Sequence, residues 1–260
     1  MQAVATRTRA LSPWPLFGLG VAASWWGVLR LHSSQGHRHG ATFAVLVPMW
    51  ALMTLAMMVP TAVPVLGSLR NVLHREGMRR WWLFLGGYLA VWLGFALAAA
   101  GLQRGLMALD LVAPDGVAVR WLGAAVLVVA GLYQFSALKQ RCLSGCVAPM
   151  TWFLRHWRDG NTGAVRMGLL HGGTCLGCCW ALMLLGFVGG LASIGLMVVA
   201  AVLMALEKLP AVATRFTIPL GVALLAAGVL WIVIAPSSSH SHQLSSLQER
   251  TTNGPVVARG

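Results

Sequence analysis

Charged side chains are scarce in this sequence, at 10% of its 260 residues, and only six of them are Asp or Glu. A soluble globular chain carries about a quarter charged residues, so an ordinary water-soluble domain is excluded. Hydrophobic residues make up 58% of the chain, and they fall in runs long enough to face lipid. The sequence also lacks a nucleophile–base arrangement, a carboxylate pair and a Gly-rich phosphate loop, so we expect a binding protein and no enzyme.

The formal net charge of +13 resembles that of a nucleic-acid-binding protein, but the Lys and Arg residues cluster between the apolar runs. Such charge is typical of loops at a membrane surface. We therefore expect the lipid bilayer, and no nucleic acid, as a partner. The N-terminus and every second loop carry thirteen of the 19 Lys and Arg residues, and the other side carries six. This bias predicts a cytoplasmic N-terminus.

Seven apolar segments approach the length of a membrane span, which is about 20 residues. We therefore expect an all-α fold, a polytopic transmembrane helix bundle with six to seven spans and no cleavable signal peptide. Pro60 and Pro64 are expected to bend or end the second span. The expected spans are 14–30, 41–66, 81–103, 117–138, 167–188, 191–207 and 216–235. The expected divisions are a cytoplasmic segment over 1–13, a transmembrane domain over 14–235 and a disordered polar tail over 236–260.

The five cysteines form two tight groups, which is unusual for a disulfide scaffold and favours metal or redox chemistry. In the stretch "HGGTCLGCCWALM", donor side chains recur at steps of four and share one face of a helix. Such imidazole, thiolate and thioether donors suit Cu(I) best, and zinc is the alternative. The stripe comprises His171, Cys175, Cys179 and Met183, with Cys178 on its edge, and the second group is Cys142 and Cys146.

Further candidate ligands lie at the ends of other spans. Met57 and Met58 end the second span, and Glu207 ends the sixth, where an intramembrane carboxylate indicates function. With seven alternating spans, these residues and both cysteine groups would converge on the cytoplasmic side. Glu207 could instead form an interfacial pair with Lys208. Two His-rich stretches, His32, His37 and His39 in a loop and His240 and His242 in the tail, are weak metal signals.

The blocks "AMMVPTAVPVL", "GLYQFSALKQRCLSGCVAPMTWF" and "GLLHGGTCLGCCWALMLLGFVGG" occur here in one order. Over residues 41–235 the chain resembles a bacterial family of predicted metal-binding integral membrane proteins. Some members of that family resemble copper chaperones that supply a tyrosinase-type oxidase. The resemblance implies a multi-pass protein of the bacterial inner membrane with a copper-dependent enzyme as client. Its motif falls on Met57, Met58, Gln134, Lys139, Cys142, Cys146, Cys175, Cys178, Cys179, Met183 and Glu207.

The sequence thus predicts a membrane protein that binds Cu(I) through Cys and Met ligands for copper delivery or homeostasis. Three alternatives stay open. One is a membrane thiol–disulfide oxidoreductase that uses the same cysteines. Another is a metal transporter subunit, although no P-type ATPase aspartate motif is present. The third is a structural subunit whose cysteines only pack in its core.

Overall fold

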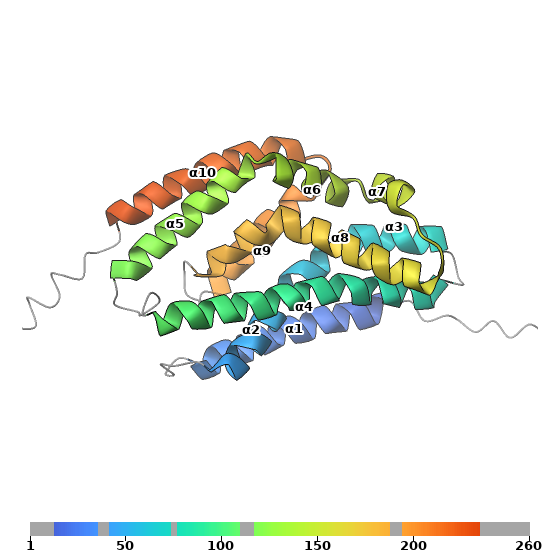
Figure 1. Ribbon diagram of the computed structural model, residues 1–260, viewed down its shortest axis with the longest axis horizontal. Coiled ribbons are helices and arrows are strands. Elements are labelled where there is room, and N and C mark those ends of the chain that lie inside the picture. Colours follow the sequence, from blue (N-terminus) through green and yellow to red (C-terminus); the bar gives the residue numbers. More distant parts are fainter. Residues whose placement is uncertain (1–12, 36–41, 74–76, 110–116, 188–193, 235–260) are drawn as a thin grey trace, which may run out of the picture.

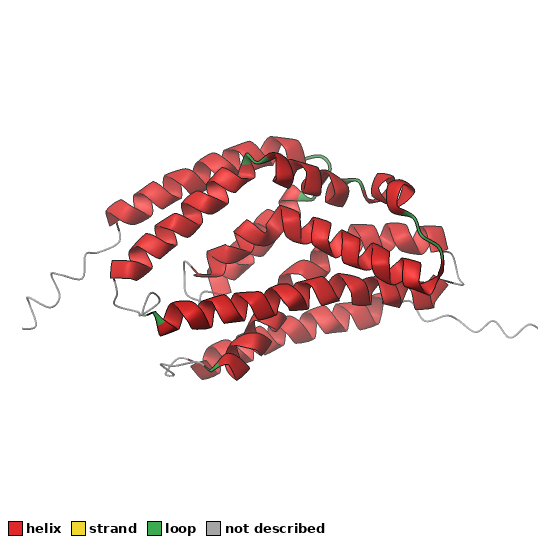
Figure 2. Cartoon of the chain, viewed as in Figure 1, coloured by secondary structure: helices red, strands yellow, loops and turns green. Residues whose placement is uncertain are grey.

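The computed structural model describes residues 13–35, 42–73, 77–109, 117–187 and 194–234, and these residues are built from helices (Figures 1 and 2). The predicted all-α fold is therefore confirmed. The helices are α1 (Trp14–Gln35), α2 (Phe43–Thr61), α3 (Val63–Leu73), α4 (Met78–Ala108), α5 (Val117–Gln134), α6 (Ala137–Val147), α7 (Pro149–His156), α8 (Gly160–Met183), the 3₁₀ turn η2 (Leu184–Phe187), α9 (Ile194–Glu207) and α10 (Ala213–Ile234).

The helices form two packed groups with α9 between them (Figure 1). Along one edge, α4 packs against α8 on one side and α2 on the other, and α1 packs on α2. Along the opposite edge α5 and α10 run side by side, and α6 crosses from this edge to α8. The chain between α2 and α3 changes direction next to Pro60, as its two prolines predict, because proline cannot continue the helical hydrogen bonds.

Glycine allows α4 and α8 to approach with their backbones in contact. A Cβ atom at Gly168 would lie against the Phe84 carbonyl oxygen, and one at Gly87 would lie 2.5 Å from the Val165 carbonyl oxygen. Neither backbone can move aside as a flexible side chain could. Small residues at helix crossings are how helices pack closely where lipid supplies no hydrophobic driving force.

Replacement of Gly168 by Ala is expected to lower the free energy of unfolding by about 1–3 kcal/mol, because the methyl group forces the two backbones apart. The matched control is Gly173→Ala, in the same helix, where a Cβ atom meets nothing within 4 Å. Thermal unfolding in detergent measures both variants. Equal midpoints for the two alanine variants would contradict the close crossing.

A sharp elbow joins α5 to α6. The two helices are bent by 68° at a short break, and the Ser136 side chain caps α6 by accepting a hydrogen bond from the Lys139 backbone N–H at 3.1 Å. The straight helix in the expected fourth span, 117–138, therefore ends at Gln134. The chain then turns inward and carries Cys142 and Cys146 toward α8.

The seven predicted spans are not confirmed. In the described part of the chain, four helices are long and apolar enough to cross a membrane, or up to five if α5 and α6 form one bent span. α9 has 14 residues, so at 1.5 Å per residue it is about 21 Å long, short of the roughly 30 Å hydrocarbon core. α1 ends in the polar sequence "RLHSSQ". Seven alternating spans therefore do not fix which side of the membrane the site faces, and the cytoplasmic N-terminus stays a prediction.

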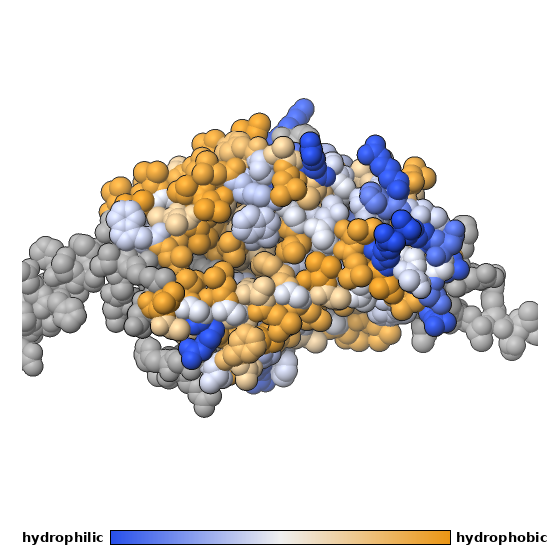
Figure 3. Space-filling view, in the orientation of Figure 1, coloured by the Kyte–Doolittle hydropathy of each residue, from blue (hydrophilic) through white to orange (hydrophobic). Residues whose placement is uncertain are grey.

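The surface separates by polarity along the long axis. Figure 3 shows hydrophilic side chains gathered at the end that holds α7 and the start of α8, and a broadly hydrophobic surface over the middle of the molecule. Exposed large hydrophobic side chains occur on α4, α5 and α10, for example Leu97, Val129 and Val233. This distribution is typical of helices that meet lipid along their length.

Most of the His-rich stretches and both predicted end segments, 1–13 and 236–260, lie outside the described residues apart from position 13. His37, His39, His240 and His242 are in this part, and the side chain of His32 is also outside the description, although its backbone belongs to α1. Their predicted roles are therefore not tested.

Candidate metal centre

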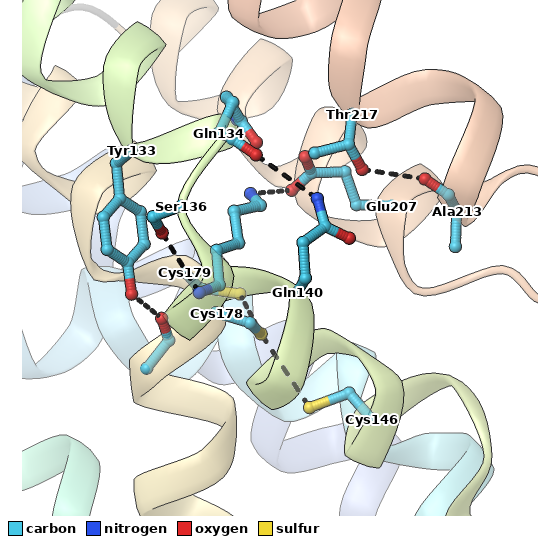
Figure 4. Close-up of polar contacts among 12 residues, drawn as sticks. Tyr133, Gln134, Ser136, Gln140, Cys146, Cys178, Cys179, Glu207, Ala213 and Thr217 are labelled. Atoms are coloured by element: carbon cyan, nitrogen blue, oxygen red, sulfur yellow. Dashed lines mark hydrogen bonds and ion pairs between the residues drawn. The ribbon is translucent and has the colours of Figure 1, made fainter.

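Three thiols from two helices meet in the interior of the protein. The Sγ atoms of Cys146 on α6 and of Cys175 and Cys178 on α8 all lie within 4.8 Å of one another, and all three residues are buried. The Cys146 and Cys178 sulfurs are 3.8 Å apart and point toward each other across the two helices (Figure 4). All five cysteines of the chain are free thiols. This thiol cluster offers three soft donors to one small volume.

Cys179 extends the cluster along α8. Its Sγ lies 3.2 Å from that of Cys178, so a fourth thiol borders the first three. Positions 171, 175, 179 and 183 are all buried, as expected for a stripe on the inner face of one helix. The i, i+4 spacing thus identified the correct face of α8.

The thiol cluster lies deeper in the helix than the sequence predicted. Cys175 was expected in the first turns of a span that began at residue 167, but α8 begins at Gly160. Fifteen residues at 1.5 Å each put Cys175 about 22 Å along the helix from its start. The helix thus includes the polar sequence "GNTG", and Asp159 precedes it with extended backbone and makes no side-chain cap.

A buried lysine approaches the cluster from the end of α9. Lys208 Nζ donates to the Cys175 sulfur at 3.1 Å and to Thr61 Oγ1 at 2.7 Å. The residue lies just beyond α9, outside the candidate spans. Burial alone would lower the pKa of its ammonium group. Negative charge on the neighbouring Cys175, Cys179 and Cys178 sulfurs outweighs burial and raises the pKa well above its ordinary value.

Tyr88 on α4 completes the surroundings of Cys175. Its hydroxyl lies 3.2 Å from the Cys175 sulfur and donates to the Met58 carbonyl oxygen at 3.1 Å. Cys175 therefore has a cation on one side and a hydroxyl on another. The Lys208 cation favours the thiolate form of Cys175, since opposite charge stabilises an anion in a low-dielectric interior. The single Tyr88 hydroxyl proton goes to the Met58 carbonyl oxygen, so Tyr88 packs beside the sulfur without donating to it.

Glu207 does not pair with Lys208, contrary to one expectation from the sequence. It forms an ion pair with Lys139 of α6 at 2.8 Å between Nζ and Oε2, with both side chains almost completely buried. In Figure 4, Glu207 lies beside Gln134 and Gln140, away from the sulfurs of Cys146 and Cys178. Within the described residues, Glu207 is not a member of the group that could hold a metal ion. Its role as a direct ligand stays untested.

The helices around the cluster also carry the remaining predicted ligands. The His171 ring stacks on Tyr88 at 6.2 Å between ring centroids, and its Nδ1 has no hydrogen-bond partner among the described residues. The Met58 backbone carbonyl accepts the hydrogen bond from the Tyr88 hydroxyl. Met57 and Met183 line a separate small cavity between α2, α8 and α9. The structure thus brings all predicted segments together, while three thiols form the tight group.

Cys142 lies apart from the buried thiols, at the protein surface. It is half-buried, and a Cβ atom at Gly177 would come within 2.6 Å of its sulfur, so Gly177 is required for this thiol to lie against α8. Beside Cys142 is a groove of about 420 Å³ that also touches Arg141, Arg155 and His156. Cys142 is therefore the thiol that a molecule outside the protein can reach.

Sequence reasoning missed Lys208 and both tyrosines as parts of the site. The chain has only two tyrosines, and both are here: Tyr88 contacts Cys175, and Tyr133 donates to the Gly177 carbonyl oxygen. Tyrosine and lysine are rare in this chain, which is poor in polar groups, and this rarity could have identified them as candidate site residues. A polar side chain kept in an apolar span generally has a specific partner.

The fold and the cluster define a class: an all-helical protein with a buried thiol site that can hold a soft metal ion. A family model described as PpoB2, a copper chaperone, matches residues 47–231. The chain therefore belongs to this copper chaperone family, and the resemblance drawn from the sequence blocks is confirmed. No curated protein and no solved structure matches the chain.

Proposed function

We propose that this protein is a membrane-embedded copper chaperone that binds Cu(I) at the thiol cluster of Cys146, Cys175 and Cys178 and delivers it to a copper-dependent enzyme. The observation that carries the proposal is the convergence of three buried thiols from two helices within 4.8 Å. It performs no reaction of its own. The copper ion is its cargo, and the apolar helices described above hold it in the bilayer.

The donor set supports Cu(I) in particular. Thiolates are soft ligands, and Cu(I) is the soft ion of copper inside cells. Charge supports the same conclusion, because Cu(I) held by three thiolates carries two net negative charges. The buried Lys208 ammonium, 3.1 Å from Cys175, would offset one of them, and a buried charge needs such a partner. Zinc is the alternative, with Cys179 as a fourth sulfur.

Delivery is supported by the position of Cys142. Its thiol lies at the groove beside α6, one turn before Cys146 in the same helix. Thiol-to-thiol exchange is an efficient route for a soft ion. Cys142 would thus pass copper from the buried cluster to the enzyme that docks at the groove.

Metal content tests the proposed function. The protein is purified in mild detergent from cells supplied with copper and zinc, and metals are measured by mass spectrometry. We expect bound copper in the natural chain and a loss of about one ion per chain in Cys146/Cys175/Cys178→Ser. Cys142→Ser is the matched control, because it removes a thiol outside the cluster and is expected to keep its copper. Equal copper in the triple variant and the control would refute the cluster as the site.

Thiol–disulfide exchange is the second candidate, favoured by the 3.8 Å separation of the Cys146 and Cys178 sulfurs. It predicts that an oxidant joins these two cysteines and that bound metal is absent. Alkylation of the purified protein, followed by mass analysis, separates the two candidates. Copper that protects the thiols from alkylation supports the chaperone, whereas a reversible disulfide in metal-free protein supports exchange.

A further inference from the structure

Four methionines line one small cavity in the middle of the molecule. Met53 and Met57 come from α2, Met183 from α8 and Met197 from α9. The cavity measures about 10 Å³, which is about the space that a single water molecule needs. The other residues that line it are apolar or glycine: Leu182, Gly186, Leu196 and Ala200.

The composition of this cavity is unusual for a core gap. The chain has 12 methionines, and four of them, from three different helices, face one space. Methionine fills irregular gaps in cores, but a gap that it had filled would not remain open. The four side chains are almost completely buried, and none of the residues around the cavity carries a charge. A neutral, sulfur-lined cavity offers thioether ligands and little else.

The cavity is connected to the thiol cluster through α8. Met183 lies one helical turn beyond Cys179 on the same buried face, and the Cys179 sulfur lies 3.2 Å from that of Cys178. Sulfur donors therefore continue along α8 from the cavity to the cluster. The thiol cluster and the methionine-lined cavity are thus two neighbouring sulfur environments of different charge, and whether Met57 and Met183 complete the cysteine shell stays a prediction.

We propose that Met53, Met57, Met183 and Met197 form a second Cu(I) site, made of thioethers only, that hands the ion to the thiol cluster. This inference rests on the proposed function in that the protein handles Cu(I). Thioethers bind Cu(I) but have little affinity for zinc. The methionine cavity would therefore also select the metal before it reaches thiols that could hold either ion.

The difference in charge gives the transfer a direction. Four neutral thioethers leave the positive charge of Cu(I) uncompensated in an apolar interior, which is costly. Thiolates compensate it. The ion keeps its oxidation state throughout, so no oxidant or reductant is needed. Each thiol that becomes a ligand releases one proton, and the Cu–S(Met) bonds break as Cu–S(Cys) bonds form.

Anaerobic Cu(I) titration of the purified chain tests the second site. We expect about two ions per chain in the natural protein and about one in Met53/Met57/Met183/Met197→Leu, because leucine keeps the volume but offers no donor. Met204→Leu is the matched control, since Met204 is buried on the same helix as Met197 but does not line the cavity. The control should bind like the natural chain. Unchanged binding in the quadruple variant would overturn the inference.

A second measurement shows the ligands directly. The Cys146/Cys175/Cys178→Ser variant is labelled with selenomethionine, and its copper X-ray absorption spectrum is recorded. Selenium neighbours around copper support the thioether site. No bound copper, or copper without selenium neighbours, overturns it and leaves the thiol cluster intact as the proposed site. Full copper in the cysteine variant together with selenium neighbours would instead support the thioether site and refute the thiol one.

Discussion

Replacement of Lys139 by methionine is expected to lower the free energy of unfolding by about 3–5 kcal/mol, the cost of leaving a buried charge without its partner. Glu207 would keep a carboxylate that is almost completely buried and 2.8 Å from where the ammonium was. Gln134 lies beside it with both side-chain polar atoms unpaired within the described residues. That amide can take over only part of the lost interaction. Chemical or thermal unfolding in detergent measures the change.

The double variant Lys139→Met/Glu207→Met is expected to recover most of this loss, because an apolar pair of similar size often replaces a buried ion pair without cost. Arg141→Met is the matched control. Arg141 lies on the same helix as Lys139 but is exposed, so its loss should change stability by less than about 0.5 kcal/mol. A double variant as unstable as the single one would show that the pair acts by more than charge.

Replacement of Lys208 by methionine is expected to weaken Cu(I) binding about 10–100-fold, the range measured for groups that touch a metal ligand. Lys208 donates to the Cys175 sulfur at 3.1 Å, which places a cation directly against the thiol cluster. Without the Lys208 ammonium, no positive charge beside Cys175 offsets the negative charge of its thiolate or of the copper–thiolate complex. Competition with a chromophoric Cu(I) chelator at fixed pH measures the affinity.

Lys208→Arg separates charge from geometry, since arginine keeps the positive charge on a differently shaped group. It should retain more affinity than the methionine variant. Arg215→Met removes an exposed cation a short distance along the chain and should leave the affinity unchanged. Equal affinities for Lys208→Met and the natural protein would mean that Cys175 needs no cation to bind copper.

Local patterns in the sequence were sufficient for the helical fold and for the inner face of α8. Steps of four put His171, Cys175, Cys179 and Met183 on one stripe, and helix geometry alone makes that stripe continuous. The proline pair near residue 60 likewise predicted the end of α2. These features depend on neighbours in sequence, and such features are read most reliably.

Features that depend on distant parts of the chain were predicted less well. A pair between the neighbours Glu207 and Lys208 was left open as an alternative. The two side chains contact Lys139 and Cys175, because side chains adjacent in sequence at a helix end need not face the same way. The seven predicted spans were not confirmed, because hydropathy does not distinguish a short buried helix such as α9 from a membrane span. The elbow before α6 determines which thiols lie close together. No single residue at the elbow predicts the angle of the bend.

The close crossing of α4 and α8 has a consequence for how copper can leave. Backbone contact at Gly168 holds α8 in place, and with it Cys175 and Cys178. Cys146 belongs to a short helix attached at the 68° elbow. If the cluster holds Cu(I) as proposed, a small rotation at the elbow would withdraw one sulfur while the other two kept the ion, and the vacated coordination position would be open to an incoming thiol. Release would then be an associative ligand exchange, in which one cysteine leaves while two stay bound. The ion would keep protein ligands until a thiol of the recipient had bound it.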